Sequence, residues 1–372
     1  MMRESVFENA ILGDACCSDT IGATDREWIK RAVSLIEADF HRSADTHLLK
    51  FPIASLPGID IYLKDESTHP TGSLKHRLAR SLFLYGLCNG KIGPETLIVE
   101  ASSGSTAISE AYFARLLGLE LVAVVPESTS PAKIAEIEHF GGRCEFAPGS
   151  AIYDHAEAIA RAHGGYYMDQ FTFAERATDW RGNNNIAKSL FQQMDREPNP
   201  APSWIVVGAG TGGTSATIGR FIRYRPEQYG NTQLCVADPE GSVFFNGFEE
   251  PGSVPPECGP SRLEGVGRPR LEPSFIPSVV DRMIRVSDAA SIATTHWLSQ
   301  KLGRRVGGST GLNMFATLAL AEEMVANGQS GSLVTLICDS GARYDSTIFN
   351  HDWLKAEGID LSPVLRFLGR YD

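Results

Sequence analysis

Residues 204–214 read WIVVGAGTGGT, a short apolar run that leads directly into a glycine-rich loop. The run Trp204–Val207 is typical of a buried strand, and the apolar spacing after the loop predicts a helix over 215–224. Four glycines within 208–214 let backbone amides approach an anion closely, and the start of the helix adds further N–H donors. The stretch therefore predicts a strand–loop–helix unit of an α/β protein with a phosphate group at the loop.

The same alternation extends along the chain on both sides of this unit. Strands are predicted at 59–63, 97–100, 121–125, 143–146, 234–237 and 333–338. Helices are predicted at 26–42, 75–87, 106–117, 131–140, 151–163, 287–302 and 311–327. Short apolar strands that alternate with helices indicate parallel sheets covered on both faces. Residues 239–278 are rich in Gly and Pro, and so long a loop in a compact domain is usually functional or mobile.

Composition excludes several classes of protein. The 372 residues are 42% hydrophobic, which is ordinary for a globular protein and excludes global disorder. The 34 Lys and Arg residues against 45 Asp and Glu residues give a net charge of −11, so we expect no nucleic-acid partner and no membrane partner. An apolar stretch of the roughly 20 residues that span a bilayer is absent from the sequence.

The seven cysteines form no CxxC pair, and an odd number argues against a disulfide framework. Reduced thiols are typical of the cytosol, so we expect a cytoplasmic protein. Cys16 and Cys17 could form a redox or metal pair, but we interpret them as incidental residues of a loose N-terminal arm, and we expect no metal site.

Two further loops carry candidate chemistry. The lysine segment, residues 64–77 (KDESTHPTGSLKHR), contains a turn that opens a predicted helix, with Lys75 in its first turn. A cation there opposes the helix dipole, and this environment favours loss of the amine proton. Taken alone, the position is better explained by an ordinary solvated lysine of a helix. Residues 100–106 (EASSGST), the serine loop, follow a strand, and their hydroxyls and amides suit a carboxylate or a simple helix cap.

A dinucleotide site stays open as an alternative at the glycine-rich loop. Gly208, Gly210 and Gly213 satisfy the spacing GxGxxG. The loop follows a complete α/β series, however, and Asp238 is the one candidate for the acidic ribose partner.

Together these segments resemble the cysteine synthase and cystathionine β-synthase family, whose members are fold-type II pyridoxal phosphate (PLP) enzymes. Residues 64–77 are similar to the family's lysine segment, 210–214 to its phosphate loop and 102–106 to its substrate-carboxylate loop. The segments 169–171 (DQF) and 339–344 (DSGARY) are similar to its glutamine segment and its C-terminal serine segment. The order and spacing agree from about residue 46 to 350, and five ordered motifs are far more specific than one.

The resemblance implies a role for each matched residue. Lys75 would bind the cofactor covalently and move the Cα proton of the substrate. The phosphate of PLP would be held by Gly210, Thr211, Gly212, Gly213 and Thr214. Ser105 would also contact the cofactor, and Ser340 would face its pyridine nitrogen. The substrate would bind through Ser102, Ser103, Thr106 and Gln170, with Gly265 near its amino group.

The resemblance also implies a fold of two open, twisted, mostly parallel sheets flanked by helices, with PLP in the cleft between two domains. We expect an N-terminal arm and helix over 1–45, a large PLP-binding domain formed by 46–80 and 179–372, and a smaller mobile domain over 81–178. It further implies a homodimer that acts on an amino acid.

Three departures from the family pattern refine the expected activity. The family usually has Asn where this chain has Ser105 and Asp where it has His76, and residues 172–185 differ from the synthases. These departures resemble a bacterial branch that includes mycobacterial-type L-cysteine desulfhydrases. We therefore expect β-elimination on L-cysteine to sulfide, pyruvate and ammonia. The alternatives are a cysteine synthase-like replacement on O-acetylserine, another β-replacement such as formation of diaminopropionate, and a non-catalytic binding or regulatory protein.

Overall fold

The computed structural model describes residues 23–42, 45–149, 151–252 and 261–372. The expected arm before residue 23, with Cys16 and Cys17, lies outside the described residues, and so does Cys258. The described chain is an α/β fold, and its two mostly parallel sheets confirm the expected fold class. Within the described residues, none of the helices has both the length and the apolar character needed to cross a membrane.

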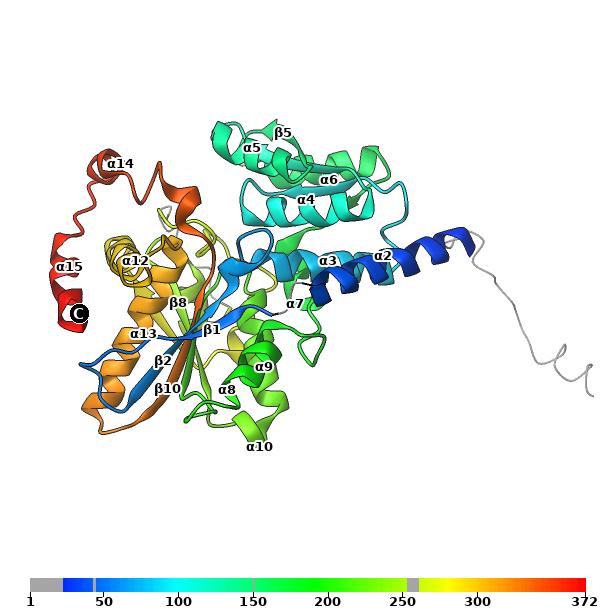
Figure 1. The fold of residues 1–372 in the computed structure, drawn as a ribbon. Helices are drawn as coiled ribbons and strands as arrows, with labels where there is room; N and C mark the ends of the chain where they lie inside the picture. Colours follow the sequence, from blue (N-terminus) through cyan, green and yellow to red (C-terminus); the bar gives the residue numbers. More distant parts are fainter. Residues whose placement is uncertain (1–22, 43–44, 150, 253–260) are drawn as a thin grey trace, which may run out of the picture.

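The larger sheet has six strands and forms the lower half of the molecule in Figure 1. Its spatial order is β1 (His47–Lys50), β2 (Ile59–Asp65), β10 (Gly331–Ile337), β7 (Trp204–Gly208), β8 (Gln233–Pro239) and β9 (Arg282–Val286). The first strand is antiparallel to β2, and the other neighbours are parallel. The edge strands β1 and β9 were not predicted, because they are partly exposed and lack a continuous apolar run.

Helices cover both faces of this sheet, as its apolar strands require. Ile61 and Leu63 of β2 pack into one core with the helices α12 and α13, whereas Tyr62 packs into the opposite core with α8 and α9. The covering helices are α8 (Ile186–Met194), α9 (Gly213–Tyr224), α12 (Asp288–Leu302) and α13 (Gly308–Ala326). Shorter helices lie at the periphery: α10 (Pro226–Tyr229), α11 (Phe244–Glu249), α14 (His351–Ala356) and α15 (Ser362–Leu368).

The helices α12 and α13 approach each other very closely at one glycine. A Cβ atom at Gly311 would lie 2.1 Å from Oγ1 of Thr295 and 2.2 Å from the backbone oxygen of Ser291. Any side chain at this position would therefore force the two helices apart.

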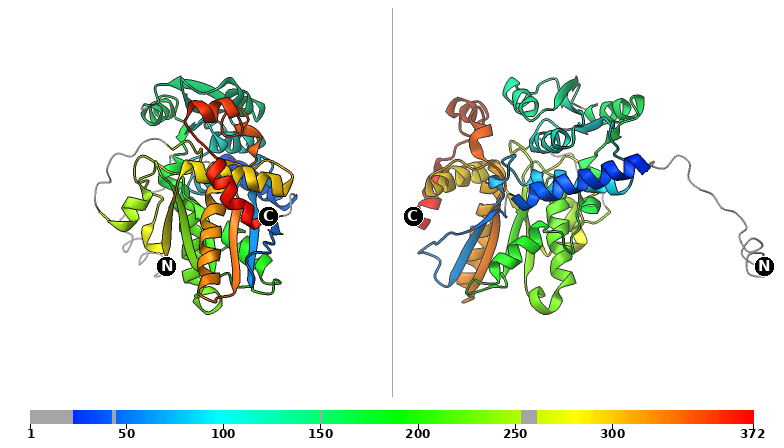
Figure 2. Two further views of the ribbon diagram at one scale, coloured as in Figure 1. Left: turned by 90° about the vertical axis from the view of Figure 1, so that its left-hand side faces the viewer. Right: turned by 45° about the vertical axis from the view of Figure 1, so that its right-hand side comes forward.

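The second sheet has four parallel strands and forms the upper half of the molecule in Figure 1. Its order is β5 (Arg143–Ala147), β4 (Leu121–Pro126), β3 (Ile98–Ala101) and β6 (Tyr166–Tyr167). It is flanked by α4 (Ser105–Leu117), α5 (Pro131–His139) and α6 (Ile152–Ala162). The views in Figure 2 show these elements at one end of the larger sheet.

Two helices join the smaller sheet to the rest of the chain. The first residues of α3 (Lys75–Cys88) follow the larger sheet, but Leu82 and Phe83 are buried in the core under α4. The helix α2 (Ala23–Arg42) packs on α3 and α4 through Ala32 and Ile36. A further helix, α7 (Gln170–Ala177), leads back to the larger sheet. The domain boundaries expected at 45, 80 and 178 remain predictions.

Candidate active site

A cavity of about 450 Å³ lies between the two sheets. Its walls follow the carboxyl ends of three parallel strands: the serine loop after β3, residues 208–214 after β7 (the glycine loop), and Cys338–Asp339 after β10. Ligands of open α/β sheets bind at this edge of the strands. The loops that the sequence singled out therefore meet at one cavity.

Lys75 is the first residue of α3 and lines the cavity. Its backbone is fixed on the end of β10, because the Leu74 N–H donates to the Cys338 carbonyl at 2.8 Å. Burial lowers the pKa of Lys75, and the positive charge of Arg268 lowers it further, while Cys338 and Asp339 act in the opposite direction. The amine of Lys75 therefore loses its proton more readily than an exposed lysine does.

The backbone of the glycine loop lies close to the amine of Lys75. A Cβ atom at Gly210 would lie 2.3 Å from the Gly265 oxygen and 3.9 Å from Lys75 Nζ. Gly212 adopts a left-handed φ of 91° at the start of α9, where a side chain would be strained. Backbone amides at a helix start are donors that can bind an anion.

All but two of the predicted site residues line the cavity. Those that line it are Lys75, Ser102, Ser103, Ser105, Thr106, Gln170, Gly210, Thr211, Gly212, Thr214 and Gly265. Gly213 lines an adjoining pocket instead. Ser340 lines neither of these two: its N–H donates to Gly72, and its hydroxyl accepts from the Ala342 N–H.

Side-chain hydrogen bonds hold the serine loop. The Thr106 hydroxyl donates to Gln170 Oε1 at 2.7 Å, and the Gln170 N–H donates to Glu100 Oε2 at 3.2 Å. Glu100 is fully buried against Glu110 of α4, which is also fully buried. Burial raises the pKa of Glu100 to about 7 and that of Glu110 well above its ordinary value, so both carboxyl groups keep their protons to a higher pH than an exposed glutamate does.

Several groups of the cavity were missed by sequence reasoning. Ser309, in the first turn of α13, places a hydroxyl on the wall. Its signal was present, because Gly307-Gly308-Ser309-Thr310-Gly311 is a second glycine-rich stretch before a helix. Asp339 also lines the cavity, and its Oδ1 atom is buried without a hydrogen-bond partner among the described residues. Burial raises the pKa of Asp339 to about 6.

The segment around Gly265 brings a cation to the same wall. Arg268 donates to Glu272 Oε1 at 2.7 Å and to the Tyr153 hydroxyl at 2.6 Å, and it lies 4.1 Å above the Phe171 ring. Glu264 pairs with Lys133 of α5 at 2.8 Å. The Arg268–Tyr153 and Glu264–Lys133 contacts connect the segment around Gly265 to α6 and α5, which flank the smaller sheet.

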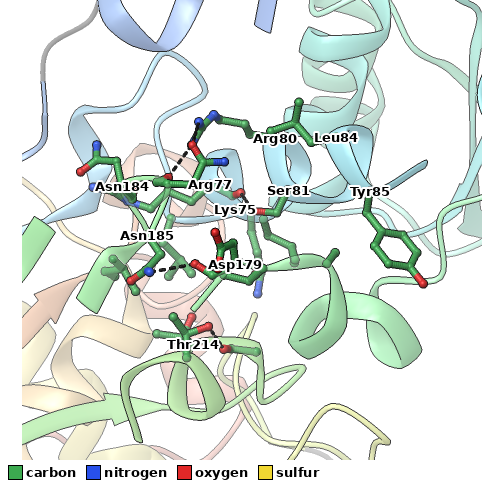
Figure 3. A pocket seen from close by; sticks show the side chains of 18 of the residues that line it. Lys75, Arg77, Arg80, Ser81, Leu84, Tyr85, Asp179, Asn184, Asn185 and Thr214 are labelled. Carbon is green, nitrogen blue, oxygen red and sulfur yellow. Dashed lines mark hydrogen bonds between the residues drawn. The ribbon is translucent and has the colours of Figure 1, made fainter. Parts of the chain in front are cut away.

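The adjoining pocket, of about 260 Å³, is shown in Figure 3. It lies between α3 and residues 177–186, and it shares Lys75 and Thr214 with the main cavity. Arg77 donates to the Asn184 carbonyl, and Asn185 donates to the Asp179 carbonyl, which fixes the 177–186 segment. In the described part of the chain, no three His, Cys, Asp or Glu side chains are grouped to hold a metal ion.

Comparison with known proteins identifies the family. Residues 42–339 match the pyridoxal-phosphate dependent enzyme family. The chain belongs to this family. It is 58% identical to the L-cysteine desulfhydrase of Mycobacterium tuberculosis over 353 residues, which cover 94% of this chain and 95% of that protein. It is 30% identical to cysteine synthase B of Campylobacter jejuni, over 81% of this chain and 93% of that protein.

Solved structures of other enzymes share the fold. The O-acetylserine dependent cystathionine β-synthase of Helicobacter pylori is 28% identical and superposes with a TM-score of 0.71, over 84% of this chain and 97% of that chain. An O-ureido-L-serine synthase, 23% identical, superposes with a TM-score of 0.73 over 87% and 98% of the two chains, which speaks for the fold alone. The protein is therefore a PLP-dependent enzyme of fold type II, which confirms the cofactor that the resemblance implied.

Proposed function

We propose that this protein catalyses PLP-dependent β-elimination on L-cysteine. L-cysteine and water would give hydrogen sulfide, pyruvate and ammonia. The observation that carries the proposal is the 58% identity to the L-cysteine desulfhydrase of Mycobacterium tuberculosis, which extends over 94% of the chain. The protein would therefore be a carbon–sulfur lyase.

The cavity wall offers a fitting place for the cofactor. Lys75 Nζ lies close to Gly210, where even a methyl side chain would collide with the Gly265 backbone. Lys75 would bind PLP, and the amides of Gly210, Thr211, Gly212, Gly213 and Thr214 would hold its phosphate. Ser309 fits the ring nitrogen better than Ser340, because Ser309 lines the cavity. Bound PLP withdraws electrons from the substrate Cα, which makes removal of its proton feasible.

The remaining groups bind the substrate and move its proton. The hydroxyls of Ser102, Ser103 and Thr106, with the amides at the start of α4, would hold the substrate carboxylate, and Gln170 would fix this loop through Thr106. The amine of Lys75, whose pKa is lowered by burial, would accept the Cα proton at Nζ. Gly265 would lie near the substrate amino group.

A cysteine synthase-like replacement on O-acetylserine is the second candidate. It is favoured by the 30% identity to cysteine synthase B of Campylobacter jejuni. Loss of a β-substituent is common to both reactions, so the two differ in whether a second nucleophile is used.

We further propose that the protein acts as a homodimer in the cytoplasm. Light scattering of the purified protein would test the oligomeric state, and cell fractionation would test the location.

Product analysis of the PLP-loaded protein tests the proposed function. L-cysteine alone should give sulfide, pyruvate and ammonia in equal amounts. Little pyruvate from L-cysteine, with rapid formation of cysteine from O-acetylserine and sulfide, would instead establish the synthase. The Lys75→Ala variant is the control for any release of sulfide that is not enzymatic.

A further inference from the structure

Arg343 is held beside Ser105, a residue of the cavity wall, by three directed hydrogen bonds. It lies in the 3-10 helix Gly341–Tyr344, which follows β10, and its side chain is only 13% exposed. Its Nη1 atom donates to the Ser105 hydroxyl oxygen at 2.6 Å, and Nη2 donates to the Thr71 carbonyl at 2.7 Å. Its Nε atom donates to Glu136 of α5 at 2.8 Å. The guanidinium therefore has one fixed orientation, with one edge against Ser105.

This contact determines how the Ser105 hydroxyl can act. A serine hydroxyl has one proton to donate and can accept at its oxygen. A guanidinium has donors only, so the oxygen must accept from Arg343, and the hydroxyl proton stays available for another acceptor. Ser105 lines the cavity, and among the described residues its hydroxyl has no other hydrogen-bond partner. The proton is thus available to a ligand in the cavity.

The positive charge of Arg343 also strengthens this donor. Hydrogen bonds that involve a charged group are shorter and stronger than neutral ones, and linked hydrogen bonds polarise one another in a buried site. A donor of this kind suits an oxygen that carries negative charge. PLP has such an oxygen on its ring, the phenolic oxygen.

We propose that Arg343 is a positioning residue that acts through Ser105, fixing and polarising its hydroxyl so that it donates to the phenolic oxygen of PLP. The inference rests on the proposed cofactor site. It assigns to Ser105 and Arg343 together the function of a single hydrogen-bond donor to the cofactor.

The contact with Glu136 provides a matched control. Glu136→Gln removes the ion pair between Arg343 and α5 but leaves the Ser105 contact in place. If Arg343 only fastens α5 to the rest of the protein, Glu136→Gln and Arg343→Met should have the same effect. If Arg343 acts through Ser105, Arg343→Met should behave like Ser105→Ala instead.

The experiment measures the absorbance spectrum of bound PLP across pH, and the Kd for PLP added to the cofactor-free protein. We expect Arg343→Met and Ser105→Ala to shift the spectrum in the same way and to raise the Kd by about tenfold. The double variant should shift no further than either single variant, and Glu136→Gln should match the parent. Arg343→Lys, which keeps the charge but loses the fork of donors, should fall between the parent and Arg343→Met.

If the parent protein binds PLP normally, two outcomes would overturn the role of Arg343 without affecting the proposed function. One is a parent-like spectrum in both Arg343→Met and Arg343→Lys. The other is a double variant whose shift equals the sum of the two single shifts, because the residues would then act independently. If Arg343→Met does not fold, Arg343→Lys combined with Ser105→Ala provides the same test of additivity. A parent that takes up no PLP would overturn the proposed function as well.

Discussion

The glycine loop of the six-stranded sheet and the serine loop of the four-stranded sheet face the same cavity, but different atoms hold them. The glycine loop is fixed by backbone packing, since a Cβ atom at Gly210 would lie 2.3 Å from the Gly265 oxygen. The serine loop has open space at Gly104 and is held by side chains, through the Thr106–Gln170 hydrogen bond and the Arg343–Ser105 contact. The glycine loop, on the proposed cofactor side, therefore has no room for a side chain at Gly210, whereas the serine loop, on the proposed substrate side, has room at Gly104.

The largest expected effect comes from the group between the two loops. Lys75→Ala should lower turnover of L-cysteine by at least about a thousandfold, because Lys133, the other amine that lines the cavity among the described residues, is paired with Glu264. The melting temperature should stay close to that of the parent, since the side chain ends at the cavity. Release of sulfide and thermal unfolding measure the two quantities, and substantial remaining turnover would contradict the role of Lys75.

Backbone packing can be tested with one methyl group on each loop. Gly210→Ala should raise the Kd for PLP at least about tenfold, because the methyl group collides with the Gly265 backbone rather than with a movable side chain. Gly104→Ala should leave this Kd within about twofold, because its Cβ atom meets nothing within 4 Å. Titration of the cofactor-free proteins measures both values. Equal increases of the Kd in the two variants would contradict this difference in space between the glycine loop and the serine loop.

The sequence predicted most of the strand–loop–helix units, because most of the strands contain an apolar run, and β4, β7 and β8 end at Pro or Gly. The sequence did not predict which side chains enter the cavity, because their orientation depends on contacts between distant parts of the chain. Ser340 follows β10 as expected, yet its hydroxyl turns to Ala342, while Ser309 from α13 lines the cavity. Arg343 and Arg268 occur in segments of ordinary polarity, and the sequence holds no signal that their side chains would lie against Ser105 and Tyr153. Which of two nearby residues points inward depends on tertiary packing.

A smaller effect is expected from the buried pair that supports the serine loop. Burial raises the pKa of both Glu100 and Glu110 above that of an unfolded glutamate. The folded state therefore holds more protons than the unfolded state once the pH exceeds about 4.5. The free energy of unfolding should fall for this reason as the pH rises through 7.

Glu110→Gln removes one of the two carboxyl groups and keeps the size of the side chain. Relative to the parent, the variant should gain about 1 to 3 kcal/mol of stability between pH 5 and pH 8. Denaturant unfolding at the two pH values measures this gain. Glu120→Gln, an exposed position at the start of β4, is the control and should show no such gain. A parallel pH dependence in the parent and Glu110→Gln would contradict the raised pKa values of this pair.

The smallest effect should come from the exposed pair between the two sheets. Lys133 and Glu264 are about one-third exposed, and such pairs typically contribute 0.2 to 1 kcal/mol. Lys133→Ala and Glu264→Ala should each raise KM for L-cysteine about two- to threefold and leave the Kd for PLP unchanged. A double-mutant cycle on KM should give a coupling energy within that range, and an unchanged KM in both variants would show that the pair does not hold the substrate side.

The close approach of α12 and α13 at Gly311 limits how this protein can vary. A cysteine or serine in place of this glycine would already occupy the volume of the Thr295 hydroxyl and of a backbone carbonyl. In a library that samples every amino acid at each position of α13, residue 311 should return glycine alone, although it touches neither of the two pockets. An invariant glycine at position 311 would result from the close packing of α12 and α13, and it would not indicate that this residue takes part in catalysis.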